Sequence, residues 1–225
     1  MDTQNGFKNS LAINSLIFAF MIKNIIFDLG GVLLNLDFKR AFDAFAKLGF
    51  SDFDELFGQH NADDLFQKLE TGKITPAEFY KELKLIAPRE ITAEQLENAW
   101  NAMLVSYRKE SLDFLLKLKE HYSLYLLSNT NEIHHSRFLK MLQEETEYQN
   151  LHKFFIKTWY SHEIHHRKPD VEIFEFVLHD AGIEAGETLF IDDSPSNLPN
   201  AGAIGMKTQL LLPEERVENL DFASY

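Results

Sequence analysis

The sequence contains no cysteine, only two tryptophans and six prolines, and far fewer basic residues (22) than acidic ones (35). The absence of cysteine excludes disulfides, thiolate metal sites and a cysteine nucleophile, and it fits the reducing cytoplasm, where we expect this protein to be. The formal net charge of −13 argues against a nucleic-acid partner, because such proteins present a basic face to phosphates. We therefore expect a small-molecule partner.

Long apolar runs are also missing. The stretch from Leu11 to Ile22 is apolar, but Asn14 and Ser15 interrupt it and it is too short to cross a hydrocarbon core of about 30 Å. No small-residue cleavage site of a secretory signal follows it. We therefore expect no membrane partner, and we interpret residues 1–20 as an N-terminal extension.

The sequence does contain an alternation of apolar strand-like runs and helical patterns. The runs are Lys23 to Phe27, Ser123 to Leu127, Phe155 to Tyr160, Thr188 to Ile191 and Met206 to Leu212. Helical patterns cover Arg108 to His121 and Asp170 to Asp180, and Gly182 is suited to end the second. This alternation predicts an α/β fold with a doubly wound, mainly parallel sheet, in which ligands bind at the carboxyl ends of the strands.

Between Asp37 and Tyr107 the pattern changes, because helix signals follow one another and no convincing strand is visible. Thr75 to Glu78 and Thr92 to Gln95 both have the sequence of a capping box. Since this stretch follows the first strand directly, we predict that residues 37–107 form a helical cap above the carboxyl end of the sheet. Residues 21–36 and 108–225 would form the α/β core.

Polar side chains occur at four places along the chain that we expect to lie at the carboxyl ends of the predicted strands. They are Asp28, Ser128, Lys168 and the pair Asp192 and Asp193. Each has an ordinary explanation when taken alone, such as a turn, a helix cap or a solvated lysine. Together they offer a carboxylate nucleophile, a phosphate seat and hard oxygen ligands of the kind that Mg²⁺ prefers.

This order of residues resembles the haloacid dehalogenase-like (HAD) hydrolase superfamily, across nearly everything after residue 21. Within it, the runs Phe27 to Val32, Leu127 to Asn131 and Arg167 to Pro169 are most similar to the bacterial alpha-D-glucose-1-phosphate phosphatase group. They also resemble the phosphatase domain of soluble epoxide hydrolases. The resemblance implies a HAD-like core and a Mg²⁺-dependent phosphomonoester hydrolase for a small phosphorylated metabolite, such as a sugar phosphate, including an anomeric one.

The resemblance also implies a role for each residue of the substrate site. Asp28 would attack phosphorus and form an aspartyl-phosphate that water then hydrolyses. Ser128 and the Asn129 amide would hold phosphoryl oxygens. Lys168 would offset negative charge in the transition state.

The metal ligands implied by the resemblance are the Asp28 carboxylate, the main-chain carbonyl of Gly30, and Asp193. Asp192 would lie beside them, as a ligand through water or as an orienting group. Magnesium is therefore the expected cofactor.

One position departs from the family pattern, since most phosphatases of the superfamily have a second aspartate where this chain has Gly30. That aspartate is the general acid and base, a contribution of typically about 10²–10⁴-fold. Either the substrate has a leaving group that needs little protonation, or another residue takes the place of the missing general acid. The candidates for that residue are Asp37, His162, His165 and His166. The histidines lie in a polar loop and lack the metal-ligand spacing of a helix.

Three other functions stay open from the sequence. A sensor would bind phosphate and Mg²⁺ without turnover, and only Gly30 favours it. A 2-haloacid dehalogenase would leave the pair Asp192 and Asp193 without a purpose, because attack on carbon needs no magnesium. A phosphomutase shares the aspartyl-phosphate, but the missing proton-transfer residue would hamper both of its half-reactions.

Overall fold

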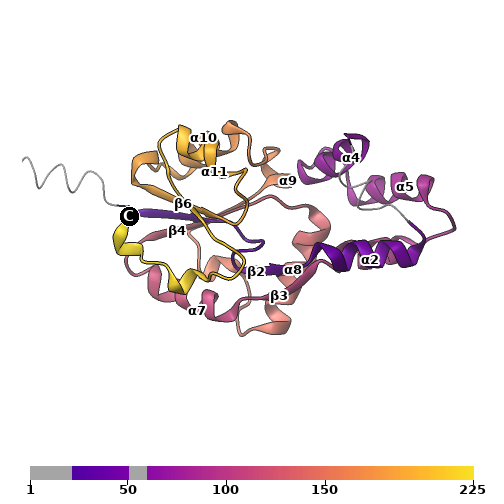
Figure 1. Ribbon diagram of the computed structural model, residues 1–225, viewed down its shortest axis with the longest axis horizontal. Coiled ribbons are helices and arrows are strands. Elements are labelled where there is room, and N and C mark those ends of the chain that lie inside the picture. Colours follow the sequence, from indigo (N-terminus) through magenta and orange to yellow (C-terminus); the bar gives the residue numbers. More distant parts are fainter. Residues whose placement is uncertain (1–21, 51–59) are drawn as a thin grey trace, which may run out of the picture.

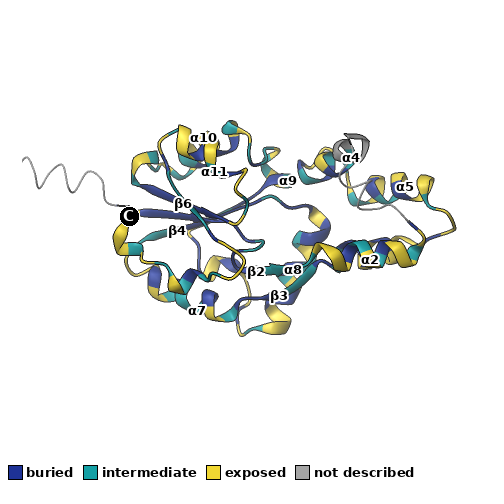
Figure 2. Cartoon of the chain, in the orientation of Figure 1, coloured by how far each residue is buried: buried dark blue, intermediate teal, exposed yellow. Residues whose placement is uncertain are grey.

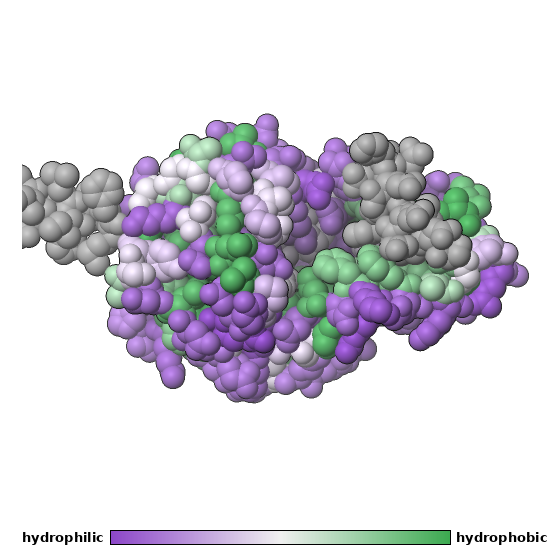
Figure 3. Space-filling model, viewed as in Figure 1, coloured by the Kyte–Doolittle hydropathy of each residue, from purple (hydrophilic) through white to green (hydrophobic). Residues whose placement is uncertain are grey.

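The computed structural model describes residues 22–50 and 60–225. The predicted extension at residues 1–20 lies outside the described residues. None of the described helices is long and apolar enough to span a bilayer. Hydrophilic residues cover much of the face shown in Figure 3, in keeping with the acidic excess of the sequence.

A five-stranded sheet forms the centre of the larger part of the molecule, with the order β5-β4-β1-β6-β7 and every neighbouring pair parallel. Its strands are β1 (Asn24–Phe27), β4 (Ser123–Ser128), β5 (Lys157–Tyr160), β6 (Thr188–Asp192) and β7 (Lys207–Leu210). All five predicted strands are therefore confirmed, to within two residues at every end. The parallel arrangement confirms the predicted α/β fold class.

Helices cover both faces of this sheet, with α10 and α11 on the opposite side of the strands from α7 (Figure 1). The helices of the core are α7 (Lys109–Leu118), α8 (Glu132–Glu145), α9 (Ser161–Ile164), α10 (Val171–Ala181) and α11 (Leu198–Ala203). Four short 3₁₀ turns lie at Leu151–Lys153, Ala185–Glu187, Val217–Asn219 and Phe222–Ser224. As predicted, α10 ends at Gly182, which has a φ of 65°.

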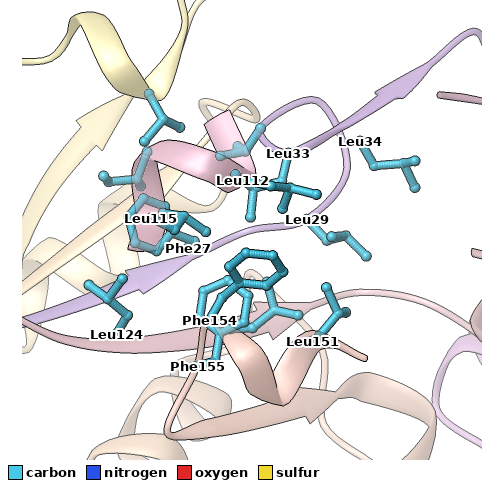
Figure 4. Packing of buried hydrophobic residues seen from close by; sticks show 14 of the residues in the cluster. Phe27, Leu29, Leu33, Leu34, Leu112, Leu115, Leu124, Leu151, Phe154 and Phe155 are labelled. Atoms are coloured by element: carbon cyan, nitrogen blue, oxygen red, sulfur yellow. The ribbon is translucent and has the colours of Figure 1, made fainter. Parts of the chain in front are cut away.

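The central strands are buried on both faces, as the dark strands in Figure 2 show. Side chains alternate along a strand, so Ile25 and Phe27 pack with α7 and α8, whereas Ile26 packs with α10. Figure 4 shows Phe27 between Leu112 and Leu115 of α7 on one side and Phe154 and Phe155 on the other. This two-sided burial fixes β1, and therefore the residue that follows it.

A small antiparallel ribbon corrects one expectation, that residues 37–107 contain no strand. β2 (Leu34–Leu36) pairs with β3 (Leu104–Tyr107). β3 is only four residues long and its partner lies about 70 positions earlier, so no local alternation or turn signal announces the pair.

Between these two strands the chain is helical where it is described, with α2 (Phe38–Leu48), α4 (His60–Glu70), α5 (Pro76–Ile86) and α6 (Ala93–Asn101). Both predicted capping boxes are present, at Thr75 and Thr92. These helices share an apolar cluster built around Phe45, Phe79 and Trp100, and α2, α4 and α5 lie together at one end of the molecule (Figure 1). The division into core and cap at residues 37 and 107 stays a prediction.

Candidate active site

Three of the predicted site residues meet because their strands are neighbours. β1 lies between β4 and β6, so Asp28, Ser128 and Asp192 reach the same edge of the sheet. The backbone N–H of Asp28 donates to the carbonyl of Ile191 at 2.9 Å, which extends the pairing of β1 and β6 up to the site. All three side chains are buried.

Lys168 enters this edge from the loop before α10 and is only 1% exposed. Its Nζ atom donates to Oδ1 of Asp28 at 2.6 Å, to Oδ2 of Asp192 at 2.7 Å and to the carbonyl of Leu127 at 3.1 Å. An ammonium has three donors, so this environment satisfies all of them. A solvated surface lysine, the ordinary explanation for this residue, is therefore wrong.

Burial and charge shift the pKa values of this site in a consistent way. Burial is the main cause that raises the pKa of Asp28 to about 7; Lys168 opposes the shift, and Asp192 and Asp193 add to it. Burial alone lowers the pKa of Lys168, but Asp28 and Asp192 together outweigh it, so that this pKa is raised. The pKa of Asp193 is raised by burial and by Asp192. Three carboxyl groups around one ammonium make a site that favours a cation.

The carboxylates fit a divalent metal ion. Asp28, Asp192 and Asp193 each offer one oxygen within 4.8 Å of the others. Asp192 is also held by the N–H of Ser194 at 2.8 Å and by Nδ2 of Asn197 at 3.0 Å. Because Lys168 and these donors already engage both of its oxygens, Asp192 is better suited to orienting the site than to binding a metal directly.

The turn after Asp28 brings the backbone unusually close to Asp193. Gly31 has a φ of 69°, and a Cβ atom placed on it would lie 1.9 Å from Oδ2 of Asp193. Only glycine fits there, both for the left-handed backbone and for the space. Gly30 beside it lines the cavity, with its carbonyl in the same turn.

A cavity of about 440 Å³ opens over these groups. Asp28, Gly30, Ser128, Asn129, Lys168 and Asp193 all line it. The Asn129 side chain does more than the sequence indicated, since its amide donates to the carbonyl of Lys168 at 2.8 Å and its oxygen accepts from the Lys168 N–H at 2.9 Å. Asn129 thereby ties the Lys168 loop to the end of β4.

The rest of the cavity wall comes largely from residues that the sequence did not single out. They are Leu34, Leu36, Phe38, Glu70, Met103, Leu104 and Phe138, and Trp100 of the helical stretch lines the cavity beside them. Oε2 of Glu70 forms an ion pair with Nη2 of Arg167 at 3.2 Å. Apart from Phe138, which lies in α8, the only signal for these residues is their position after the first strand or inside the helical stretch. Glu70 is the charged residue among them, and the apolar types of the others are those of any core.

His134 is a buried histidine in this wall that sequence reasoning missed. Its Nε2 lies 3.2 Å from the carbonyl of Trp100, which can only accept, so Nε2 carries the proton and Nδ1 accepts from Nδ2 of Asn131 at 3.2 Å. Burial lowers the pKa of His134 to about 4. A neutral ring with both nitrogens engaged positions the start of α8, which Asn131 caps.

None of the four suggested replacements for the general acid lines the cavity. Asp37 pairs with Arg40 at 3.4 Å. His165 donates from Nδ1 to the carbonyl of Thr71 at 2.8 Å, and His166 lies against Phe176. His162 lies among aromatic rings beside α8.

A doubly wound sheet with carboxylates and a buried lysine at its strand ends is suited to binding an anionic group together with a metal ion. In a comparison with protein families, residues 22–205 match the haloacid dehalogenase-like hydrolases. The chain belongs to this family, which confirms the resemblance to the superfamily found in the sequence.

Individual relatives are similar over most of their length. The chain is 37% identical over 188 residues to a D-ribitol-5-phosphate phosphatase of Bacteroides thetaiotaomicron, which covers 84% of this chain and 91% of the relative. A HAD family enzyme of the same organism, solved with magnesium and inorganic phosphate, is 41% identical with a TM-score of 0.80 and covers 87% of this chain and 97% of its own. A predicted HAD-like hydrolase of Porphyromonas gingivalis is 34% identical with a TM-score of 0.78, and the match covers 87% of this chain and 93% of its own.

Proposed function

We propose that the protein is a Mg²⁺-dependent phosphomonoester hydrolase for a small polyol or sugar phosphate, with an aspartyl-phosphate on Asp28 as intermediate. The observation that carries this proposal is the buried contact of Lys168 with Asp28 and Asp192, beside a cavity that Asp28 and Lys168 line. The similarity to a D-ribitol-5-phosphate phosphatase supports the substrate class.

Magnesium fits the ligands that this edge of the sheet presents. Asp28, Asp193 and the carbonyl of Gly30 would hold the ion, and Asp192 would orient them. When bound, the ion supplies positive charge that offsets the charge of the phosphate. The oxygen-only set, without cysteine or histidine, suits Mg²⁺ better than a softer metal.

The residues of the chain carry the two chemical steps. In the first, an oxygen of Asp28 bonds to phosphorus and the bond to the leaving oxygen breaks. In the second, water attacks the same phosphorus and releases phosphate, which regenerates the carboxylate. Ser128 and the Asn129 amide would bind the phosphoryl oxygens, and Lys168 would stabilise the added charge.

Gly30 has no side chain to donate a proton, and no suggested replacement lines the cavity. We propose that cavity water protonates the leaving oxygen. An anomeric sugar phosphate, whose leaving oxygen needs less protonation, should then have a higher kcat than a primary polyol phosphate of the same size.

The test is phosphate release from a panel of D-ribitol 5-phosphate, other polyol phosphates and sugar 1-phosphates with Mg²⁺. Asp28→Asn should abolish release, whereas Asp43→Asn, on the exposed face of α2, should leave it unchanged. Turnover that persists in Asp28→Asn would overturn the proposal. Phosphate binding without any turnover would indicate that the protein is a sensor. Halide release in the presence of EDTA would indicate that it is a dehalogenase.

A further inference from the structure

A second cluster of metal-ligating side chains lies outside the cavity wall, between α8 and α9. It consists of His135 of α8 and the consecutive residues His162 and Glu163 of α9. Nδ1 of His135 lies 3.7 Å from Oε1 of Glu163, and Nε2 of His162 lies 4.0 Å from the same oxygen. One ligand atom of each residue lies within 4.8 Å of the other two.

We propose that His135, His162 and Glu163 form a binding site for a transition-metal ion such as Zn²⁺, distinct from the carboxylate centre at Asp28. Two imidazoles and one carboxylate are a ligand set that suits zinc, with a fourth position left for water. Mg²⁺ prefers an all-oxygen set, so the two centres differ in the metal that they select.

Two of the three ligand separations are close to those that a zinc ion requires, and the third, between His135 and His162, is no more than 4.8 Å. Ligands about 2.1 Å from a tetrahedral ion lie about 3.4 Å from one another. Closing the 3.7 Å and 4.0 Å separations to that value needs movements of roughly half an ångström. The side chain of Glu163 is half exposed and can make most of this adjustment.

The histidine rings are already held in place. The His135 ring lies 4.2 Å from the ring of Tyr160 and 5.2 Å from that of Phe138, centre to centre. The start of α9 is fixed because Ser161 Oγ donates to the carbonyl of Thr130 at 2.8 Å and accepts from its N–H at 2.9 Å. Little freedom is therefore lost when a metal binds.

The His162 side chain is largely enclosed by protein at this site. Its side chain is only 10% exposed, and its Nδ1 atom is buried without a hydrogen-bond partner among the described residues. Nε2, the nitrogen that faces Glu163, would bind the metal, and Nδ1 would then carry the proton of the neutral ring.

The protonation states also suit a metal. Burial lowers the pKa of His135, and it lowers the pKa of His162 to about 4, with His135 and His165 acting in the same direction. Both rings are then neutral at pH 7, which is the form that binds metal ions. The Glu163 carboxylate adds negative charge to the pair.

A metal at this site would join α8 to α9. α9 is in contact with α4, and His165, just after it, hydrogen bonds to Thr71, just beyond α4. Binding should therefore raise the melting temperature of the whole chain, as expected of any ligand that binds only the folded state.

The experiment uses the 225-residue chain without a tag and with saturating Mg²⁺, so that the carboxylate centre at Asp28 is occupied. Zn²⁺ is titrated by calorimetry, and Co²⁺ is used in its place to record visible absorption. We expect one Zn²⁺ per chain. His135→Ala and Glu163→Gln should each weaken binding at least about tenfold, since even the outer partners of metal ligands are worth 10–100-fold.

Two variants serve as controls. His152→Ala removes an exposed histidine of a distant 3₁₀ turn, and Asp193→Asn alters the carboxylate centre; both should leave Zn²⁺ affinity unchanged. Because Glu163 is half exposed, Glu163→Gln should fold normally, which its circular dichroism will show. Absence of Zn²⁺ uptake, or equal affinity in His135→Ala, Glu163→Gln and the unaltered chain, overturns the proposal without touching the proposed phosphatase activity.

Discussion

Nζ of Lys168 lies 2.6 Å from Oδ1 of Asp28, although the two residues are 140 positions apart in the chain. The same ammonium also binds Asp192, so one buried positive charge holds two buried carboxylates. Removing one partner of such a buried charge group strongly destabilises the folded state, because the remaining charges lose their opposite charge and stay out of contact with water.

Lys168→Met should therefore destabilise the chain by about 3–5 kcal/mol in the presence of EDTA. Mg²⁺ should restore part of this loss, since the ion supplies positive charge near the same carboxylates. Urea unfolding with EDTA and with Mg²⁺ measures both effects. Lys39→Met removes an exposed pair with Asp43 and should cause no measurable change. Equal stability of Lys168→Met and the unaltered chain in EDTA would contradict this account.

Gly31→Ala tests the close approach of the turn to Asp193. The added Cβ would lie 1.9 Å from Oδ2 of Asp193, and the residue would keep a φ of 69°. We expect at least about tenfold weaker Mg²⁺ binding, from displacement of the carboxylate, and a loss of about 1–2 kcal/mol from the left-handed backbone.

The matched control is Gly186→Ala, because a Cβ there has open space around it and φ is not in the left-handed region. Its Mg²⁺ affinity, measured by calorimetry, should equal that of the unaltered chain. Unchanged affinity in Gly31→Ala would show that Asp193 is not a metal ligand.

The sequence predicted the parts of the fold that depend on local pattern. The strands before Asp28 and after Thr188 are short apolar runs buried on both faces, and such runs are readable without knowledge of their neighbours. The capping box at Thr75 was readable for the same reason, since both of its partners lie within four residues.

Contacts between residues far apart in the chain could not be predicted from the sequence. β3 forms only because Leu36 and Leu104 meet, and His135 joins His162 only because α8 lies against α9. The three histidines after Tyr160 looked like the natural cluster in the sequence, yet the structure brings one of them to a histidine 27 positions earlier. Spacing along the chain carries no information about such contacts.

Substitutions of Glu70 and Arg167 test the contact between α4 and the loop that carries Lys168. Their ion pair at 3.2 Å lies at the cavity wall and both side chains are partly exposed, so it is worth at most about 1 kcal/mol. We expect Glu70→Gln to raise KM by up to about fivefold with little change in kcat, because the pair shapes the wall and takes no part in the chemical steps.

Arg167→Met should raise KM to a similar extent, and the double variant should be no worse than either single one if the two residues act through each other. Steady-state kinetics with the best substrate of the panel measures this. Additive effects of the two substitutions would show that the residues act separately. Asp43→Asn, which breaks an exposed pair on α2, is the control.

His134 should make the stability of the chain sensitive to acid. Its pKa is about 4 in the folded state, because of burial, and 6.5 in an unfolded chain. Above pH 6.5 the ring is neutral in both states, so its titration does not change the free energy of unfolding. As the pH falls from 6.5 to 4, only the unfolded chain gains a proton here, so the folded state loses about 3 kcal/mol of stability relative to it. Below pH 4 both states are protonated and the loss is complete.

His134→Gln removes this titration and keeps an amide that can donate to the carbonyl of Trp100. We expect the variant to be less stable than the unaltered chain at pH 7, where the packing and the bond to Asn131 are lost, but to lose less stability between pH 7 and pH 4. Urea unfolding in EDTA across this range gives the two slopes. Other titrating groups, including His162, contribute to both proteins and cancel in the difference. Identical slopes would mean that His134 is not held neutral in the folded chain.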